Sequence, residues 1–387
     1  MNKNIYSIWL NMKESLFARR AAELIDYFGD AKAVYDADKI AYKESGVVTK
    51  HSDIQALMNK NLTPAVNEYE KALERGVEFI DCASEFYPER LKQIPARPIL
   101  FYAKGNINLL KQQAMFAMVG ARKATVYGKN AARDIARELT LAGMTIISGT
   151  ALGVDSASHE GALIARGKSI AVAACGLDVD YPKGNEELRR RLIEKNLIIS
   201  EYPFGTQPHS FNFPIRNRIL SGMSLGVAII EAQKHKSGSL ITAGYATEQG
   251  RDVFALPGDI NRPFSKGTND LIKNGAILLN GAEDILEEYL QRYPEMFLNK
   301  QDVEEFYQRK EPKQPPVITE SFVEYIQNGE EGQNEQLILR NIQHEPVHID
   351  TLCRISGLDT AKVNAIITIL QIKGKIKELP GKNYVRN

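Results

Sequence analysis

The sequence predicts an α/β protein built on a doubly wound parallel sheet with helices on both faces. Two observations support this prediction. Short apolar runs, which suit strands buried on both faces, alternate with helical segments from about residue 114 to residue 256. Glycine-containing turns follow the first two strands of this series, at the sheet edge where open α/β sheets bind ligands.

The first strand–turn–helix unit begins with the apolar run at residues 114–119 and breaks at Gly120. In the helix that follows, Ala131, Ile135 and Leu139 stand four residues apart, with charged residues on the other side. This spacing predicts an amphipathic helix that covers the sheet.

The second unit begins with a strand at residues 144–147 and a turn at residues 148–153. We expect the next helix to open at Asp155, because aspartate is a favourable N-cap residue. The two turns should lie side by side at the carboxyl ends of adjacent strands. Helix N-termini there would offer free N–H groups and a positive dipole end, so phosphate is the expected ligand.

Further strands and helices continue the alternation on both sides of these units. Pro214 is well placed in the first turn of one of the helices. Additional strands are predicted at residues 76–82, 98–103, 169–175, 197–201, 227–231 and 253–256, and further helices at residues 186–195, around 214–218 and at 237–249.

Composition divides the chain into four parts. Residues 1–75 carry short amphipathic helices, residues 76–292 form the sheet-containing core, and residues 333–387 form a separate unit. Between the last two lies an acidic, proline-containing linker at residues 293–332. The last unit reads as three helices and a basic hairpin, which is the pattern of a winged helix. Winged helices bind either nucleic acid or protein, and the sequence leaves both open.

The charge distribution suits a polyanionic partner. The formal net charge is only +1, but residues 282–332 hold 13 acidic against 5 basic residues, so the remainder of the chain is basic. The three cysteines show no CxxC spacing, as expected for reduced thiols in a cytoplasmic protein. We also predict no membrane span and no signal peptide, since no apolar run is long enough.

Residues suited to phosphate gather after the predicted strand ends. Arg216 and Arg218 cannot face one point on a helix, so we expect one to meet the ligand and the other to pair with a carboxylate. Nearby aromatic residues could stack on bases or belong to the core. The basic and hydroxyl residues are Arg122, Lys123, Lys183, Arg216, Arg218, Lys236, Ser148, Ser237, Ser239 and Thr242, and the aromatic ones are Tyr202, Phe204, Phe211 and Phe213.

Several enzyme classes lack their sequence signals. The chain has neither a GxGxxG dinucleotide motif nor a P-loop, and its six histidines show no metal-ligand spacing. Asp155 and His159 stand at i, i+4 and could form an acid–base pair, although a structural pair is the simpler interpretation. We therefore predict a protein that is not an enzyme and uses no metal or cofactor. A hydrolase of nucleotides or sugar phosphates is the alternative, and an adaptor that uses only its end domains is a third.

Seven segments in this order closely resemble the DprA/Smf family of DNA-processing proteins, from about Gly76 to Glu283. The resemblance implies an extended Rossmann-like core, a small helical domain like a sterile alpha motif (SAM-like) before it, and a winged helix after it. It also implies a homodimer, formed through the core, that binds and protects single-stranded DNA and helps to load the RecA recombinase in natural transformation. The segments are VGARKATVYG, SGTALGVDSASH, CGLDVDYPKGN, SEYPFGT, FPIRNRIL, KSGSLITAGYA and FALPG.

The resemblance also places the DNA site. We add to it basic and turn residues that follow the same strand ends. Ala121 stands where many members have serine, which removes one possible hydroxyl contact. By resemblance the pocket contains Gly120, Arg122, Lys183, Phe213, Arg216, Asn217, Arg218, Ser237 and Gly238, and the added candidates are Lys123, Ser148, Gly149 and Lys236.

Overall fold

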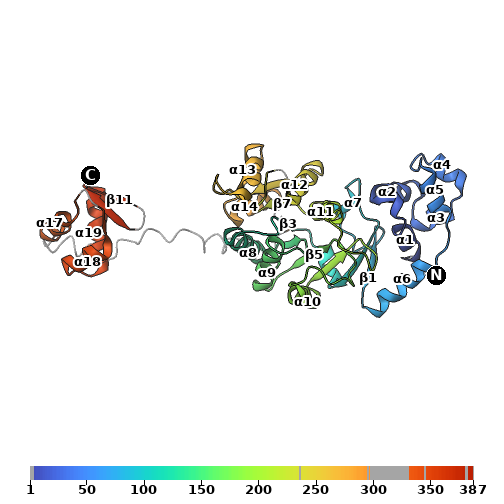
Figure 1. The fold of residues 1–387 in the computed structure, drawn as a ribbon, viewed down its shortest axis with the longest axis horizontal. Helices are drawn as coiled ribbons and strands as arrows, with labels where there is room; N and C mark the ends of the chain where they lie inside the picture. The colour runs from blue at the N-terminus through green and yellow to red at the C-terminus, as the bar shows by residue number, and fades with distance from the viewer. Residues whose placement is uncertain are drawn as a thin grey trace. The chain divides into compact units, whose positions relative to one another are not determined.

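The computed structural model describes residues 4–234, 237–293, 296, 331–343, 346–379 and 382–386 (Figure 1). The chain divides into two units, Met1–Phe306 and Tyr307–Asn387, and each is described by itself. Lys236 and almost all of the predicted linker lie outside the described residues. Among the helices that are described, none is both long and apolar enough to cross a membrane.

The first unit contains one sheet of nine strands in the order β1-β2-β6-β5-β4-β3-β7-β8-β9. From β6 to β9 all neighbouring strands are parallel, whereas β1 and β2 extend the sheet with antiparallel pairs. The strands are β1 (Glu78–Asp81), β2 (Leu100–Gly105), β3 (Met115–Val119), β4 (Thr145–Ser148), β5 (Ser169–Ala173), β6 (Leu197–Ser200), β7 (Gly226–Ile229), β8 (Asp252–Ala255) and β9 (Ile277–Leu278).

The strand order reverses at β3, which pairs with β4 on one side and β7 on the other. In the register of the sheet, Ala117 of β3 is paired with Ile147 of β4 and with Val227 of β7. The connections therefore run outward in both directions from the gap between β3 and β7. Such a switch point leaves a crevice at the carboxyl ends of the strands. The predicted doubly wound α/β sheet is confirmed.

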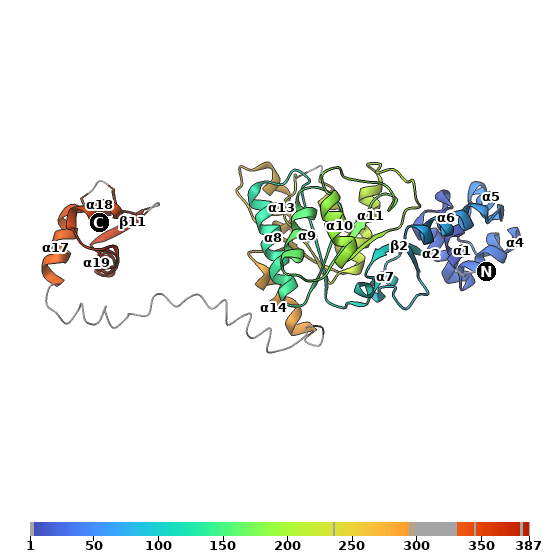
Figure 2. The ribbon, with the colours of Figure 1, turned by 90° about the horizontal axis from the view of Figure 1, so that it is seen from below.

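Helices cover both faces of the parallel strands. Figures 1 and 2 show α8, α9 and α10 along one face, and Figure 1 shows α11 and α12 on the other. Residues of β3 alternate between these layers, because Met115 and Ala117 pack in the cluster with α11 whereas Phe116 contacts Phe254 and Tyr289. The helices are α7 (Glu89–Lys92), α8 (Val126–Leu141), α9 (Val154–Ile164), α10 (Glu186–Lys195), α11 (Asn212–Met223), α12 (Gly238–Glu248), α13 (Lys266–Lys273) and α14 (Ala282–Arg292), with short 3₁₀ turns η2 (Ile107–Lys111) and η3 (Pro263–Ser265).

The N-cap of helix α9 lies two residues before the predicted one. Gly153, with φ of 89°, takes the N-cap position, and Asp155 lies inside the first turn. A Cβ atom at Gly153 would lie 2.3 Å from the carbonyl oxygen of Ala121, so only glycine allows the two turns to touch. The predicted contact between the turns is present, but the predicted cap residue is wrong.

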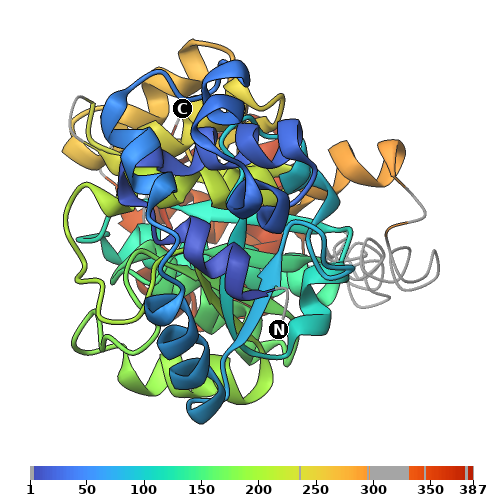
Figure 3. The same ribbon diagram turned by 90° about the vertical axis from the view of Figure 1, so that its right-hand side faces the viewer.

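Six helices precede the sheet and pack against its β1–β2–β6 edge (Figure 3). Their buried side chains form one hydrophobic cluster with Tyr102 of β2 and Ile198 of β6. Asn11 also donates a hydrogen bond to the carbonyl oxygen of Glu201 at 3.0 Å. The helices are α1 (Asn4–Asn11), α2 (Phe17–Phe28), α3 (Ala31–Asp36), α4 (Lys39–Glu44), α5 (His51–Met58) and α6 (Thr63–Glu74), with the 3₁₀ turn η1 (Glu14–Leu16).

The second unit has its own core and a three-stranded sheet of order β10-β12-β11. The three helices and the hairpin occur where the sequence predicts a winged helix. Ile366 and Leu370 of the last helix are fully buried in this core. The elements are α17 (Glu331–Asn341), β10 (Val347–His348), α18 (Ile349–Ser356), α19 (Thr360–Ile372), β11 (Ile376–Leu379) and β12 (Asn383–Arg386).

Candidate functional site

A cavity of about 490 Å³ opens at the switch point, beyond the carboxyl ends of β3 and β7. It lies among the turn after β3 and the N-terminal ends of α11 and α12, which come from distant parts of the sequence. Its walls contain eight of the thirteen predicted site residues: Gly120, Arg122, Lys123, Phe213, Arg216, Asn217, Ser237 and Gly238.

The Gly120 turn is held against the first turn of α9. A Cβ atom at Gly120 would lie 2.5 Å from the Cγ2 atom of Val154, which leaves no room for a side chain. The backbone N–H of Val154 donates to the carbonyl oxygen of Ala121 at 3.3 Å. The turn is therefore fixed with its basic residues, Arg122 and Lys123, on the cavity wall.

Arg216 forms a buried positive charge in the cavity wall. It is only 3% exposed, and its guanidinium donates to the Oδ1 atom of Asn217 at 3.1 Å and to the carbonyl oxygen of Val172. Burial lowers the pKa of Arg216, and the nearby Asp155 carboxylate opposes this shift. The described ion pairs include Arg218 but not Arg216. Arg216 therefore lines the cavity without a carboxylate in direct contact, although the Asp155 carboxylate lies close by, on the other side of Gly149.

Asp155 lies on the same wall, and Gly149 separates it from Arg216. A Cβ atom at Gly149 would lie 2.2 Å from the Oδ2 atom of Asp155 and 2.5 Å from the Nη2 atom of Arg216. The same Asp155 oxygen accepts a hydrogen bond from the backbone N–H of Ala151 at 3.2 Å. Burial raises the pKa of Asp155, although the charge of Arg216 acts in the opposite direction. Gly149 thus leaves the space in which the side chains of Asp155 and Arg216 pack.

The guanidinium of Arg122 lies over the ring of Phe213, with its central carbon 4.1 Å from the ring centroid. The ring of Tyr181 also contacts Phe213, at 5.7 Å between centroids, and Phe213 itself is buried. Phe213 therefore orients Arg122 and has little free surface of its own. Arg122 is exposed and keeps its outer side for a ligand.

The expected free helix N-termini are only partly available. At α8, the Glu231 carboxylate accepts hydrogen bonds from the backbone N–H of Thr125 at 2.8 Å and from its hydroxyl at 2.6 Å. A carboxylate of the chain itself is thus hydrogen-bonded to the N-cap residue of α8, which makes this helix N-terminus a poor place for a phosphate. By contrast, the N-cap Ser237 of α12 makes no side-chain capping hydrogen bond, and it lies in the cavity wall with Gly238.

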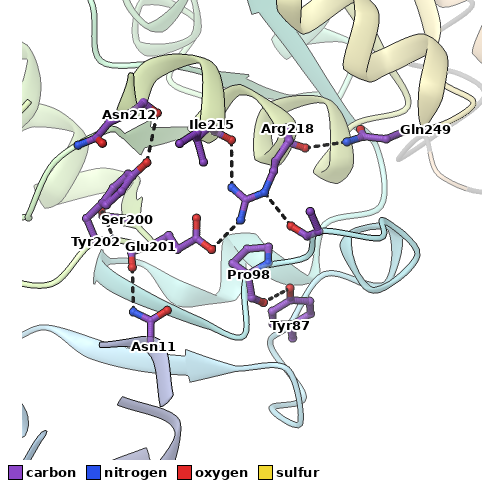
Figure 4. Close-up of polar contacts among 11 residues, drawn as sticks. Asn11, Tyr87, Pro98, Ser200, Glu201, Tyr202, Asn212, Ile215, Arg218 and Gln249 are labelled. Atoms are coloured by element: carbon purple, nitrogen blue, oxygen red, sulfur yellow. Dashed lines mark hydrogen bonds and ion pairs between the residues drawn. The ribbon is translucent and has the colours of Figure 1, made fainter. Parts of the chain in front are cut away.

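Arg218 points away from the cavity, toward β6. Its guanidinium donates to the Glu201 carboxylate at 2.6 Å and to the carbonyl oxygens of Ala96 and Ile215 at 2.7 and 3.0 Å (Figure 4). The sequence required the two arginines of α11 to diverge, and they do. Arg218 pairs with a carboxylate, whereas Arg216 faces the cavity.

Three other predicted residues, Ser148, Gly149 and Lys183, are described and lie outside the cavity wall. Ser148 is buried and donates its hydroxyl to the carbonyl oxygen of Met118 at 2.7 Å. Lys183 is exposed on the loop before α10, Gly149 lies behind Arg216, and Lys236 is outside the described residues. We therefore leave Ser148 and Arg218 out of the contact surface proposed below.

His159 belongs to the packing beneath the site. Its ring nitrogens form hydrogen bonds with the hydroxyl of Ser169 at 2.7 Å and the carbonyl oxygen of Gly149 at 2.8 Å. It is buried, and burial lowers its pKa to about 4. Among the described residues, no group of three potential metal ligands occurs. The hydrogen bonds of His159 are therefore structural, and its partners are Ser169 and Gly149, not Asp155.

Sequence reasoning missed several wall residues, among them Ser210, Gln233 and Phe264. Gln233 reaches the cavity from the loop after β7, and Phe264 from the 3₁₀ turn η3 after β8. Neither carries a motif or stands directly at a strand end, so only the fold brings them here.

Comparison with known proteins assigns the family. The family described as DNA recombination-mediator protein A matches residues 78–290, more than half of the chain. The family described as DprA winged helix domain matches residues 328–382. The chain belongs to the DprA/Smf family.

Relatives from several bacteria agree with this assignment. DNA processing protein DprA of Bacillus subtilis is 41% identical over 219 residues, which span 57% of this chain and 73% of the relative. Protein Smf of Escherichia coli is 36% identical over 308 residues, or 79% of this chain and 76% of the relative. The similarity to Protein Smf reaches beyond the core.

Solved structures of family members share the fold. The crystal structure of DprA from Streptococcus pneumoniae matches with a TM-score of 0.65 and 34% identity, over 74% of this chain and 98% of that chain. DNA processing protein A from Helicobacter pylori, whose structure concerns single-stranded DNA binding, matches with a TM-score of 0.50 and 31% identity, over 56% of this chain and 97% of that chain.

Proposed function

We propose that this protein binds single-stranded DNA with backbone phosphates in the cavity at the switch point. One observation carries the proposal: Arg216 is a buried cation that faces the cavity without a carboxylate in direct contact. A buried charge of this kind is costly unless an anion compensates it, and Asp155 does so without forming an ion pair with Arg216. A phosphate in the cavity would add to this compensation. Arg122 on Phe213 and the uncapped start of α12 supply further donors in the same cavity.

The proposed contacts are independent of sequence. Arginine side chains and backbone N–H groups bind phosphates, which are the same for every nucleotide. These donors would bind phosphate oxygens and would not read the edges of the bases. Binding should therefore tolerate any sequence and weaken as salt rises, because the DNA releases counterions.

Family membership supports the wider role. We infer that the protein acts as a homodimer formed through the core, protects single-stranded DNA and helps to load RecA on it during natural transformation. In this role it is a cytoplasmic DNA-binding protein without catalytic activity. Members of the family named DNA processing protein DprA, and the Helicobacter pylori structure that concerns single-stranded DNA binding, support the DNA-binding part of this proposal.

The test is fluorescence anisotropy of labelled oligo-dT over a salt series with wild type, Arg122→Ala and Arg216→Ala. Each variant should bind more weakly and lower the salt slope by roughly one. Arg190→Ala is the matched control, because Arg190 is an exposed arginine on α10 that already pairs with two glutamates. Circular dichroism would establish folding of the buried Arg216 variant. Unchanged affinity in both cavity variants would refute the site.

The alternative function is hydrolysis of a nucleotide or sugar phosphate, and one observation favours it: the Asp155 carboxylate lies on the cavity wall. To act as a general base, Asp155 would need the reacting group of a substrate within hydrogen-bonding distance. His159, the other candidate, is sealed from solvent by Ser169 and Gly149. Turnover of nucleoside phosphates by purified protein that is lost in Asp155→Asn would support this alternative.

A further inference from the structure

Of the four aromatic residues that the sequence places near the arginines, Tyr202, Phe204, Phe211 and Phe213, only Phe211 is exposed. Phe213 is covered by Arg122 and Tyr181, and Phe204 lies under Arg75 and against Tyr102. Phe211, by contrast, is 62% exposed. A base that stacks beside this cavity therefore finds its free aromatic surface at Phe211.

Phe211 does not stand alone on the surface. Its ring stacks on that of His209, with 5.3 Å between the centroids and 6° between the planes. Two parallel rings form a flat platform in which His209 supports Phe211 from one side. The other side of Phe211 is left to solvent, which suits a third flat ring.

The loop that carries the platform is fixed at both ends. The side-chain amide of the buried Asn212 donates to the carbonyl oxygens of Ala174 and Gln207, both at 3.1 Å. The backbone N–H of Asn212 donates to the carbonyl oxygen of His209 at 3.0 Å, and that of His209 to Gln207 at 2.8 Å. Because the rings are held in advance, little conformational freedom is lost when a base stacks on them.

The platform adjoins the cavity along the chain. Ser210 stands between His209 and Phe211 in the sequence and lines the cavity. Phe213, two residues after Phe211, lines it as well. We propose that the Phe211–His209 pair is a stacking site for a nucleobase of the strand whose phosphate occupies the cavity. This inference rests on the proposed DNA binding and adds the position where the strand leaves the cavity.

The stacking site makes a distinct contribution to binding. A stacked base tolerates any sequence because every base has a flat face, so the platform would not restrict the DNA that is bound. The platform would give DNA a higher affinity than a sugar-phosphate chain that carries no bases. An oligomer of abasic sugar-phosphate units should therefore gain nothing from Phe211, whereas oligo-dT should.

The experiment compares wild type, Phe211→Ala and Phe211→Trp for binding of oligo-dT and of an abasic oligomer of equal length. Phe211→Ala should weaken oligo-dT binding roughly fivefold or more and leave the abasic oligomer unchanged. Phe211→Trp should retain the affinity for oligo-dT, and its emission should be quenched on binding. Trp9, the single native tryptophan, is buried and provides the background signal in wild type.

Tyr27→Ala is the matched control, because Tyr27 is an exposed aromatic residue on α2 that lies outside the cavity wall. It should bind both oligomers like wild type. If Arg122→Ala weakens binding while Phe211→Ala does not, the platform is refuted and the cavity site stands. If wild type binds neither oligomer, the proposed function itself fails.

Discussion

Arg218 and Glu201 form an ion pair at 2.6 Å in which the two side chains are only 5% and 11% exposed. The backbone of Glu201 also accepts a hydrogen bond from Asn11 of the first helix (Figure 4). Arg216 projects from the same helix, α11, toward the cavity. One helix thus joins the N-terminal helices to the candidate DNA site.

Breaking this pair should destabilise the fold more than breaking a surface pair. Glu201→Ala leaves the Arg218 charge buried without its carboxylate, which should cost about 3–5 kcal/mol of unfolding free energy. Glu194→Ala removes a partner of the exposed Arg190 and should cost much less, because water and salt screen an exposed pair. Urea denaturation followed by circular dichroism measures both. Equal small losses would mean that the buried pair contributes no more than the exposed one.

A methyl group at Gly149 should weaken DNA binding without touching DNA. In Gly149→Ala the new Cβ atom would collide with Asp155 and with the Nη2 atom of Arg216, so the arginine must move. We expect weaker oligo-dT binding by anisotropy together with lower stability. Gly244→Ala is the control, because no atom lies within 4 Å of its Cβ position on α12. That variant should be as stable as wild type, or more stable by up to about 1 kcal/mol. Wild-type affinity in Gly149→Ala would show that the position of Arg216 is not important.

The stability of the core should depend on His159 between pH 6.5 and about 4. Burial lowers the pKa of His159 from 6.5 to about 4, and the charge of Arg216 contributes to the lowering. The unfolded chain therefore binds a proton at a higher pH than the folded chain does. The stabilisation is complete above pH 6.5 and is lost as the pH falls toward 4, by about 3 kcal/mol.

The variant His159→Gln isolates this effect from the titration of carboxylates. The difference in unfolding free energy between wild type and variant should shrink by about 3 kcal/mol between pH 7 and pH 4. Urea denaturation at each pH gives this difference. A constant difference would mean that His159 has the same pKa in the folded and unfolded chains.

The strands and helices were predictable because their signals are local. The apolar run of β3, the spacing in α8 and the bounds of α10 can be read from neighbouring residues alone. The cavity was predictable in part, since parallel strands bring their carboxyl ends to one edge. Gly120 and Arg216 therefore meet there, as expected.

The errors arose where a distant residue completes a local feature. The start of α8 was expected to offer free N–H groups, but Glu231, two residues after β7, is hydrogen-bonded to its N-cap residue Thr125. For Phe213 the sequence left open whether it stacks on bases or belongs to the core, and the ring is buried with Arg122 from another loop over it. No local pattern contains these contacts, because the fold that creates them joins residues about a hundred positions apart.

The last prediction separates the cavity from the winged helix. All residues of the cavity wall belong to the first unit, so a chain that ends at residue 293 should bind oligo-dT within a few fold of wild type. Lys377→Ala in the full chain removes a basic residue of the hairpin and should change binding little. If truncation abolishes binding while Arg122→Ala has no effect, the winged helix carries the DNA and the first unit serves another purpose. If truncation has no effect and Arg122→Ala weakens binding, the adaptor hypothesis fails, since the strand then depends on the cavity and not on the winged helix.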